Sequence, residues 1–167
     1  MPQYKIFNGP MPTTGLQVPV TTGTAVKTML QVKSVTDVKY KVKAWGVSMN
    51  GAAAAAGCQW ELVETGTVFG TVTASAAADI IKWDDSGSPV PTTYLTVGVS
   101  STGYTATAEG SVAATRVFDS QLVQPTGQYV YEFSLGNEPM VAAGSALRVR
   151  CDAVVAIDAL CWVIVEV

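Results

Sequence analysis

The run Ile157-Asp158-Ala159-Leu160-Cys161-Trp162-Val163-Ile164-Val165-Glu166-Val167 decides the fold of this chain. All of its odd-numbered residues are apolar, and so are three even-numbered ones, Leu160, Trp162 and Ile164. Successive side chains of a strand point to opposite faces, so this pattern predicts a strand that is covered on both sides. Such a strand lies in the middle of a sheet. We expect one face to pack inside the protein and the face of Leu160, Trp162 and Ile164 to contact another subunit.

Further alternating segments fill most of the chain. In 146–152, Leu147, Val149 and Cys151 alternate with charged residues, which makes this segment a candidate neighbour for the last strand. Other candidate strands are 28–33, 38–48, 58–64, 68–74, one or two within 95–110, 112–124 and 128–135, with a single short helix at 75–85 that Ser75 caps. About eight to ten strands with little helix predict an all-β, antiparallel, jelly-roll-like β-sandwich.

The N-terminal part differs from the rest in composition. Pro10, Pro12 and Pro19 fall within a segment rich in glycine and threonine, which favours extended chain over helix. We therefore predict an extended N-terminal arm at 1–24 and one sandwich domain at 25–167.

The chain is 167 residues long with only 14% charged residues, against roughly 25% in a typical soluble domain. So few charges protect a surface poorly against association, which favours an oligomer. The net charge of −3 argues against a nucleic-acid partner. The charge is also unevenly distributed, since residues 1–60 carry +5 and residues 61–167 carry −8.

The three cysteines, Cys58, Cys151 and Cys161, lie in apolar alternating patterns and are expected to be buried free thiols, which suits folding in a reducing cytoplasm. The first residues do not continue into an apolar segment, so we expect no signal peptide. No apolar run reaches the roughly 18–20 residues of a membrane span, so no membrane partner is expected.

The sequence offers little for catalysis. It has no histidine, which removes the commonest general base and metal ligand, and no phosphate-binding loop motif. Asp84-Asp85 resembles a weak calcium loop but more simply forms a turn. The carboxylate pairs Glu61/Glu64 and Glu109/Asp119 are more simply solvated than catalytic. We predict no enzyme activity, no cofactor and no metal.

Two features remain as candidate contacts. Lys39, Lys41 and Lys43 alternate with apolar residues and form a lysine stripe. In one interpretation the stripe docks onto an acidic protein surface. In the other it is an ordinary solvent-exposed strand face, or it protects a sheet edge against pairing with another sheet. Trp83 is equally compatible with a contact residue and a core residue, whereas for Trp45, Trp60 and Trp162 we prefer the core to an interface.

Several segments together resemble small β-rich structural proteins of tailed phages, especially phages of actinobacteria, which are usually head decoration (cement) or minor capsid proteins. These segments are Lys27-Thr28-Met29-Leu30-Gln31, Trp45-Gly46-Val47-Ser48, Glu61-Leu62-Val63-Glu64-Thr65-Gly66-Thr67-Val68, Pro125-Thr126-Gly127-Gln128-Tyr129-Val130-Tyr131 and Ala143-Gly144-Ser145-Ala146-Leu147-Arg148-Val149-Arg150. The closing strand pattern also resembles a jelly roll of the tumour-necrosis-factor-like kind, in which the last strand faces a trimer axis.

The resemblance implies a non-enzymatic virion protein, made in the host cytoplasm and bound to the outer surface of a phage head, which it stabilises. Its partners are then the major capsid protein of the same phage and two further copies in a homotrimer. Lys39, Lys41, Lys43, Pro10 and Pro12 are the expected capsid contacts. The alternative is a receptor- or carbohydrate-binding jelly-roll module of a phage tail or surface protein that uses the loop aromatics Tyr94, Tyr104 or Trp83. An enzyme on a β-scaffold is the third hypothesis.

Overall fold

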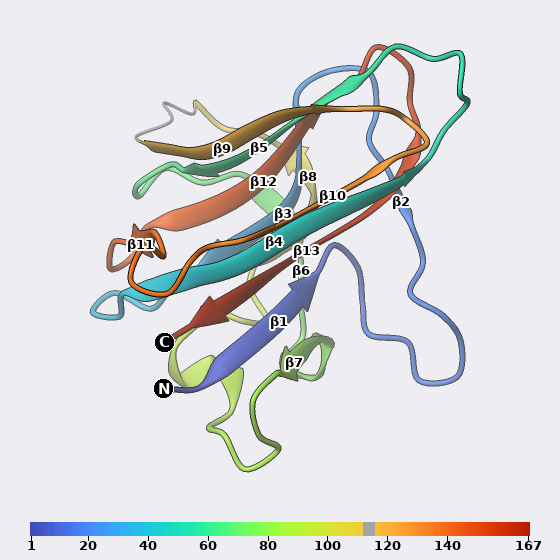
Figure 1. Ribbon diagram of the computed structural model, residues 1–167. Coiled ribbons are helices and arrows are strands. Elements are labelled where there is room, and N and C mark those ends of the chain that lie inside the picture. Colours follow the sequence, from blue (N-terminus) through green and yellow to red (C-terminus); the bar gives the residue numbers. More distant parts are fainter. Residues whose placement is uncertain (112–115) are drawn as a thin grey trace.

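The computed structural model describes residues 1–111 and 116–167, which form an all-β sandwich (Figure 1). Eight strands form its two central four-stranded layers, namely β1 (Gln3–Phe7), β3 (Lys27–Lys33), β4 (Tyr40–Asn50), β5 (Cys58–Glu64), β9 (Arg116–Val123), β10 (Gln128–Glu132), β12 (Ala146–Asp152) and β13 (Asp158–Glu166). The additional strands are β2 (Val20–Thr21), β6 (Thr71–Ala74), β7 (Ile80–Lys82), β8 (Gly103–Ala108) and β11 (Met140–Val141).

The two sheets are antiparallel and have the strand orders β10-β4-β13-β1-β7 and β6-β8-β3-β12-β5-β9. When only the eight central strands are numbered along the chain, the first sheet holds strands six, three, eight and one in spatial order. The second sheet holds strands two, seven, four and five. Consecutive strands thus lie in different layers, except the fourth and fifth, which pair with each other in the second sheet. This is the jelly-roll arrangement, so the predicted fold class is confirmed.

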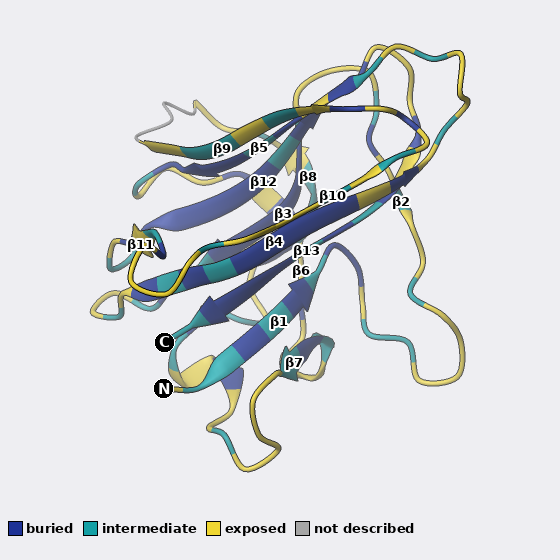
Figure 2. Cartoon of the chain, in the orientation of Figure 1, coloured by how far each residue is buried: buried dark blue, intermediate teal, exposed yellow. Residues whose placement is uncertain are grey.

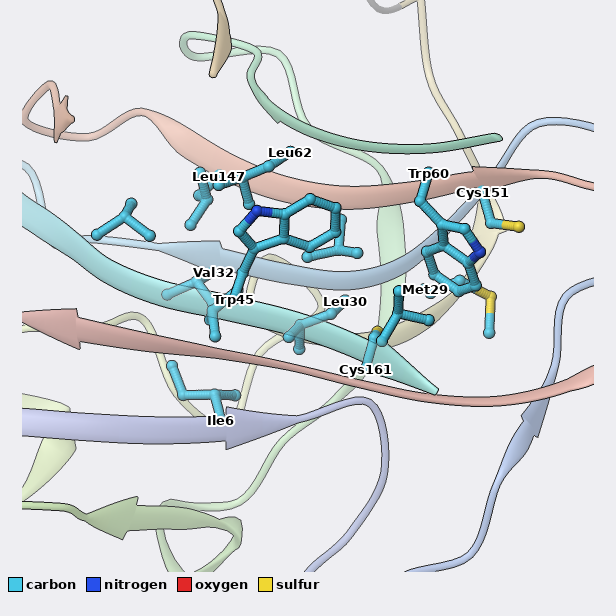
Figure 3. Close-up of a cluster of buried hydrophobic side chains, with 14 of the residues drawn as sticks. Ile6, Met29, Leu30, Val32, Trp45, Trp60, Leu62, Leu147, Cys151 and Cys161 are labelled. Carbon is cyan, nitrogen blue, oxygen red and sulfur yellow. The ribbon is translucent and has the colours of Figure 1, made fainter. Parts of the chain in front are cut away.

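The hydrophobic core fills the space between the two sheets. Trp45 of β4 and Trp60 of β5 are fully buried there, together with Leu62 and Leu147 (Figure 3). Burial of this apolar surface supplies most of the folding free energy, because each large apolar side chain removed from water contributes about 1.5–3 kcal/mol. The predicted core positions of Trp45 and Trp60 are therefore confirmed.

The cysteines are also where the sequence predicts them. Cys58, Cys151 and Cys161 are free and buried. Burial raises the pKa of Cys151 to about 12 and that of Cys161 well above its usual value. Because only the thiolate is reactive, these groups act as small apolar core side chains.

Strand β13 lies between β4 and β1, so its predicted central position is confirmed. Its side chains Cys161, Val163 and Val165 are fully buried in the core. The neighbouring strand differs from expectation, because the first sheet places β4 and β1 beside β13, whereas the proposed neighbour β12 lies in the opposite sheet. The sequence pattern identifies which residues point inward but not which strand lies alongside.

The prediction that residues 1–24 form an arm is wrong for residues 3–7. These residues form β1, which pairs with β13 on one side and with β7 on the other. Tyr4 and Ile6 are buried in the core, while the proline-rich chain begins only after Asn8. Composition averaged over the whole segment concealed this short alternating strand.

The predicted helix at 75–85 is also wrong. Its apolar residues belong instead to a single 3-10 turn, η1 (Ala77–Asp79), followed by strand β7, and a second such turn, η2, spans Pro91–Thr93. The backbone N–H of Ala76 donates to the Asp79 carboxylate at 2.8 Å, whereas the Ser75 hydroxyl is buried without a partner in the described part of the chain. Ser75 therefore does not cap a helix. Of the strand expected at 112–124, the described residues show Arg116–Val123 as β9, and its first part, 112–115, lies outside the described residues.

Candidate interaction surface

The outer face of the first sheet points away from the second sheet, and β13 lies near its centre. Leu160, Trp162 and Ile164 all point to this outer face, since their neighbours along β13 point into the core. Leu160 and Trp162 are half-buried, and Ile164 is buried with 7% of its surface exposed. The structure therefore brings the three proposed interface residues together on one face that the protein's own second sheet does not cover.

The ring of Trp162 lies over Gly46 of β4, which has no side chain. Gly46 is opposite Trp162 in the β4–β13 register. A Cβ atom at Gly46 would lie only 2.7 Å from Cζ2 of Trp162, closer than real side-chain contacts allow. The glycine therefore creates the space that the indole ring fills, and the strand backbone supports the ring from below.

Three aromatic rings on this face surround a single ammonium group. The Nζ atom of Lys5 lies 4.3 Å from the ring centre of Trp162, 4.6 Å from that of Trp83 and 5.1 Å from that of Phe7. Burial lowers the pKa of Lys5. Such cation–π contacts stabilise by about 0.5–1 kcal/mol at exposed sites and by more when desolvated. We call Lys5, Phe7, Trp83 and Trp162 the aromatic cluster.

The cluster shows where two tryptophans lie. For Trp83 the sequence was equally compatible with a contact and with the core, and for Trp162 the core was preferred. Trp83 is 50% exposed and belongs to the surface, not to the core. Trp162 also lies outside the core, so the preferred core placement of this residue is wrong because its side chain points to the outer side of β13. A half-exposed group of large aromatic rings is typical of protein contact surfaces.

The lysine stripe is largely neutralised within the chain. Nζ of Lys43 is 2.5 Å from a Glu138 oxygen and 4.0 Å from Glu166, and Nζ of Lys41 is 3.9 Å from Glu138. The hydrogen bond from Lys43 is the largest cause that lowers the pKa of Glu138, to about 2. Lys39 lies in the exposed turn before β4. Two of the three proposed docking charges thus hold the β10–β11 connection against β4, which reduces their capacity to attract an acidic partner.

The strand β4 also departs from simple alternation beside this stripe. A register shift in the β4–β13 ladder falls between Ile164 and Val165, so that Ala44 is opposite Ile164 and Val42 is opposite Val165. Trp45 consequently points into the core, and the side chain of Ala44 does not lie on the same face of the sheet as that of Val42. Such a bulge inserts one extra residue into a strand and reverses the alternation beyond it.

The proline-rich segment after β1 forms a projecting loop that is attached at both ends (Figure 1). Asn8 is fully buried and extends the β1–β13 ladder with its side chain, because Nδ2 donates to the Ala159 carbonyl at 3.0 Å and Oδ1 accepts the Cys161 N–H at 2.9 Å. Val20–Thr21 returns to β13 as β2.

Between these anchors Pro10 is exposed and Pro12 is half-buried. Leu16 and Val18 of the loop are 90% and 68% exposed. The loop therefore offers exposed apolar side chains in addition to those of the aromatic cluster.

The acidic residues that the sequence offers as carboxylate pairs make other contacts in the structure. No group of three or more candidate metal ligands occurs among the described residues. Glu61 pairs with Arg150 at 2.8 Å, and Glu64 accepts the N–H of Ala142 at 2.9 Å and pairs with Arg116. The members of the proposed pair Glu61/Glu64 are thus engaged in separate contacts.

The second proposed carboxylate pair is separated in the same way. Glu109 accepts the Thr28 N–H at 2.5 Å, whereas Asp119 accepts the Tyr129 hydroxyl at 2.8 Å and the Trp45 indole N–H at 3.1 Å. The Asp84-Asp85 segment closes a turn, in which Ser88 donates to Asp84 at 2.9 Å. No helix in the described part of the chain is long and apolar enough to cross a bilayer.

Sequence reasoning identified part of this surface and missed the rest. The alternation of the last strand indicated Leu160, Trp162 and Ile164. Lys5 and Phe7 were missed because they were assigned to an arm, although the alternation of Tyr4 and Ile6 was a usable signal. Neither the protein-family models nor the curated proteins with which the chain was compared give a match.

Proposed function

We propose that this chain is a non-enzymatic structural protein of a virion, a decoration protein that binds the outer surface of a tailed-phage head and stabilises it. The observation that supports this proposal best is the outer face of the first sheet, where a cluster of half-exposed aromatic rings surrounds Lys5 on a chain with few surface charges. Such a face suits contact with a protein surface. The resemblance to decoration proteins of tailed phages points to the major capsid protein as the partner.

We assign two surfaces to two kinds of contact. The face of Leu160, Trp162 and Ile164, with the aromatic cluster, would contact further copies in a homotrimer, and the projecting loop would contact the capsid. Lys39 lies at the opposite end of the first sheet from this loop, because Thr21 and Asn50 are opposite Asp158 at the start of β13, whereas Lys41 is opposite Glu166 at its end. A trimer multiplies weak loop contacts, because once one loop is bound the other two bind at high effective concentration. Contacts with several capsid subunits then raise the free energy needed to separate them.

The trimer contact is tested by the mass of the protein in solution. The native chain is expected at three times 17.4 kDa or at a whole multiple of that mass. Trp162→Gln is expected to give a smaller species, because it removes the central ring of the surface. Leu122→Gln is the matched control, since Leu122 is 76% exposed but belongs to β9 in the other sheet. A monomeric native protein would contradict the trimer.

The capsid contact is tested by mixing the protein with undecorated capsids and imaging them by electron microscopy. Bound density is expected for the native chain. The double variant Leu16→Ser, Val18→Ser should bind with at least tenfold lower occupancy at a limiting protein concentration, because both side chains are exposed on the loop. Absence of bound density at every concentration of the native protein would refute the decoration function.

The alternative is a receptor- or carbohydrate-binding module, which the half-exposed Trp83 favours because sugar rings stack on exposed aromatic side chains. The structure weakens this alternative at one point. The Lys5 ammonium already lies over the rings of Trp83 and Trp162, so a stacked sugar would have to displace it. Tyr94 packs against Tyr4 with ring centres 6.4 Å apart and is only partly exposed. Specific glycan-array binding that is lost in Trp83→Ala would support this alternative over the first proposal.

A further inference from the structure

Strand β10 forms an open edge of the first sheet. It pairs with β4 on one side and is the terminal strand of the sheet order on the other. Four of its five residues are exposed, and only Tyr129 is half-buried (Figure 2). Val130 is 53% exposed and Tyr131 is 44% exposed. Large apolar side chains therefore accompany an open backbone edge.

The hydrogen-bond pattern shows which backbone groups of β10 face outward. Phe133 donates its N–H to the Lys43 carbonyl at 2.9 Å, and Met49 donates to the Gly127 carbonyl at 3.1 Å. In an antiparallel ladder the residues bonded to the partner strand alternate with residues whose N–H and C=O groups point away. The odd-numbered residues of this segment thus bond to β4, and the backbone groups of Gln128, Val130 and Glu132 point to the open side.

This edge lacks the features that usually prevent pairing with another chain. Its ladder with β4 runs from Gln128 to Glu132 without a register shift, whereas the ladders of β5 with β9 and of β4 with β13 each contain one. The five residues include neither proline nor lysine. Proteins commonly protect exposed edges with bulges, prolines or lysines, because an unprotected edge is a template for strand addition.

The sequence of the edge is nearly its own reverse, Gln128-Tyr129-Val130-Tyr131-Glu132. If two copies pair antiparallel about a two-fold axis at Val130, Val130 lies opposite Val130 of the second copy. Gln128 then lies opposite Glu132 of the second copy, so an amide faces a carboxylate and no like charges meet. The outward backbone groups of Gln128, Val130 and Glu132 fall at the hydrogen-bonded positions of this register.

We propose that β10 pairs with β10 of a second copy of this chain, antiparallel and centred on Val130, so that the first sheets of two copies become one continuous sheet. Tyr129 then lies opposite Tyr131 of the second copy at non-hydrogen-bonded positions, where facing side chains are closest. This pairing covers the exposed Tyr131 ring, and cross-strand aromatic pairs are among the stabilising ones. The contact is isologous, because the same strand serves both copies.

This two-fold contact goes beyond the proposed trimer and does not depend on it, because the aromatic cluster takes no part in it. Because each trimer carries three β10 strands, the two contacts together would link trimers into larger assemblies. The experiments therefore use the Trp162→Gln background as well as the native chain. In that background the trimer contact is removed and the two-fold contact is expected to remain.

Cross-linking tests the register directly. The three native cysteines are buried, so a cysteine introduced on β10 is the accessible thiol. Val130→Cys should form a disulfide-linked dimer with oxidised glutathione, because residues at the axis have Cα atoms about 5.5 Å apart, within the range of disulfides. Gln128→Cys alone is the matched control, since its two copies would lie about 13 Å apart along the strands.

The mixture of Gln128→Cys with Glu132→Cys is expected to cross-link like Val130→Cys, because these positions face each other across the axis. At least a tenfold higher yield of dimer for Val130→Cys than for Gln128→Cys supports the proposed register. Equal yields for the two variants, or no dimer from Val130→Cys, would overturn it.

Charge substitutions at the axis test the same contact without cross-linking. Val130→Lys and Val130→Glu each place two like charges opposite each other and should lower dimer formation at least tenfold. In the Trp162→Gln background, an equimolar mixture of the two variants should restore a heterodimer of twice 17.4 kDa. Both variants should melt within a few degrees of the native chain, since Val130 is exposed on each monomer. Failure of the mixture to restore the dimer while both variants are folded would refute the two-fold contact.

Discussion

At the scale of single residues, the position of Trp162 depends on the absence of a side chain at Gly46. The ring occupies the space where a Cβ atom would lie, at 2.7 Å from Cζ2. We expect Gly46→Ala to destabilise the fold by about 1–3 kcal/mol, the usual cost of overpacking. The measurement is the free energy of unfolding in urea. In Trp162→Ala the same substitution should cost at least about 1 kcal/mol less, because neighbouring residues couple in a double-mutant cycle.

Gly15→Ala serves as the control for this cycle. A Cβ atom at Gly15 meets no other atom within 4 Å, so this substitution should leave stability unchanged. The close contact between Gly46 and Trp162 would be contradicted if Gly46→Ala cost the same with and without the Trp162 ring.

A second residue-scale feature is the fully buried guanidinium of Arg148 on the outer side of β12. It donates to the Glu109 carbonyl at 3.1 Å and to the Val68 carbonyl at 3.3 Å, and it lies 3.4 Å from the Glu109 carboxylate. These contacts hold two connecting segments against the second sheet. Desolvation lowers the pKa of Arg148, and the Glu109 carboxylate opposes this effect.

We expect Arg148→Met to destabilise the protein by about 1–3 kcal/mol, because the carbonyls of Val68 and Glu109 lose their partners. The loss should be local. Hydrogen exchange should increase most in 65–74 and 103–111, while the amides of β13 keep their protection. Lys39→Met, which removes an exposed cation, should change neither quantity. Equal loss of protection in β13 would show that Arg148 supports the whole sandwich instead.

At the scale of elements, the β10–β11 connection is attached to β4 through Glu138. The hydrogen bond from Lys43, with help from the backbone N–H of Gly136, lowers the pKa of Glu138 to about 2 from its usual 4.5. The unfolded chain therefore binds this proton more readily than the folded protein between these two values. It follows that the contribution of Glu138 to stability is fully present above pH 4.5 and is lost as the pH falls toward 2.

Glu138→Gln is expected to lower the melting temperature at pH 7 and to make the melting temperature less dependent on pH between 4.5 and 2. The relevant measurement is the difference between the native and variant melting curves at each pH, because other carboxylates titrate in the same range. Asp37→Asn, which removes an exposed acid, is the control. A constant difference across the whole range would mean that the Lys43–Glu138 contact does not survive in solution.

The elements also show how far the sequence predicts the structure. Alternation located most longer strands and the inward residues of β13, because side-chain direction is a local property of a strand. Local alternation could not show the shift in β4 that turns Trp45 inward, nor the adjacency of β1 and β13, which lie at opposite ends of the sequence. Strand pairing depends on contacts between distant segments. The aromatic cluster illustrates this limit, since Lys5, Trp83 and Trp162 meet only after three separate strand regions are in place.

At the scale of the whole molecule, the uneven charge along the chain is partly compensated by pairing. Lys41 and Lys43, from the basic first part, contact Glu138 and Glu166 from the acidic second part. Folding thus brings basic residues of the first part and acidic residues of the second part into contact on one sheet. The net charge of −3 consequently says little about the charge that any one surface presents to a partner.

The two parts of the N-terminal region should behave in opposite ways when they are altered. Strand β1 pairs with β13 along its whole length, and Tyr4 and Ile6 belong to the core. Removing residues 2–7 would expose the edge of β13 and open the core, so we expect no cooperative thermal transition. By contrast, Leu16→Ser with Val18→Ser alters only exposed loop positions and should shift the melting temperature by a few degrees at most.

Circular dichroism with thermal melting separates these outcomes, and Ile6→Asp provides a full-length version of the first change. Ile6 is 1% exposed, so an aspartate there would carry an unpaired charge into the core and should abolish cooperative folding. A shortened chain that still melted cooperatively would mean that residues 2–7 are dispensable, as expected for an arm. The expected result is cooperative folding of the loop variant and loss of cooperative folding in both β1 variants. This result would place the start of the sandwich at β1. Within the N-terminal region, only the loop between β1 and β2 would then be left for a capsid-binding role.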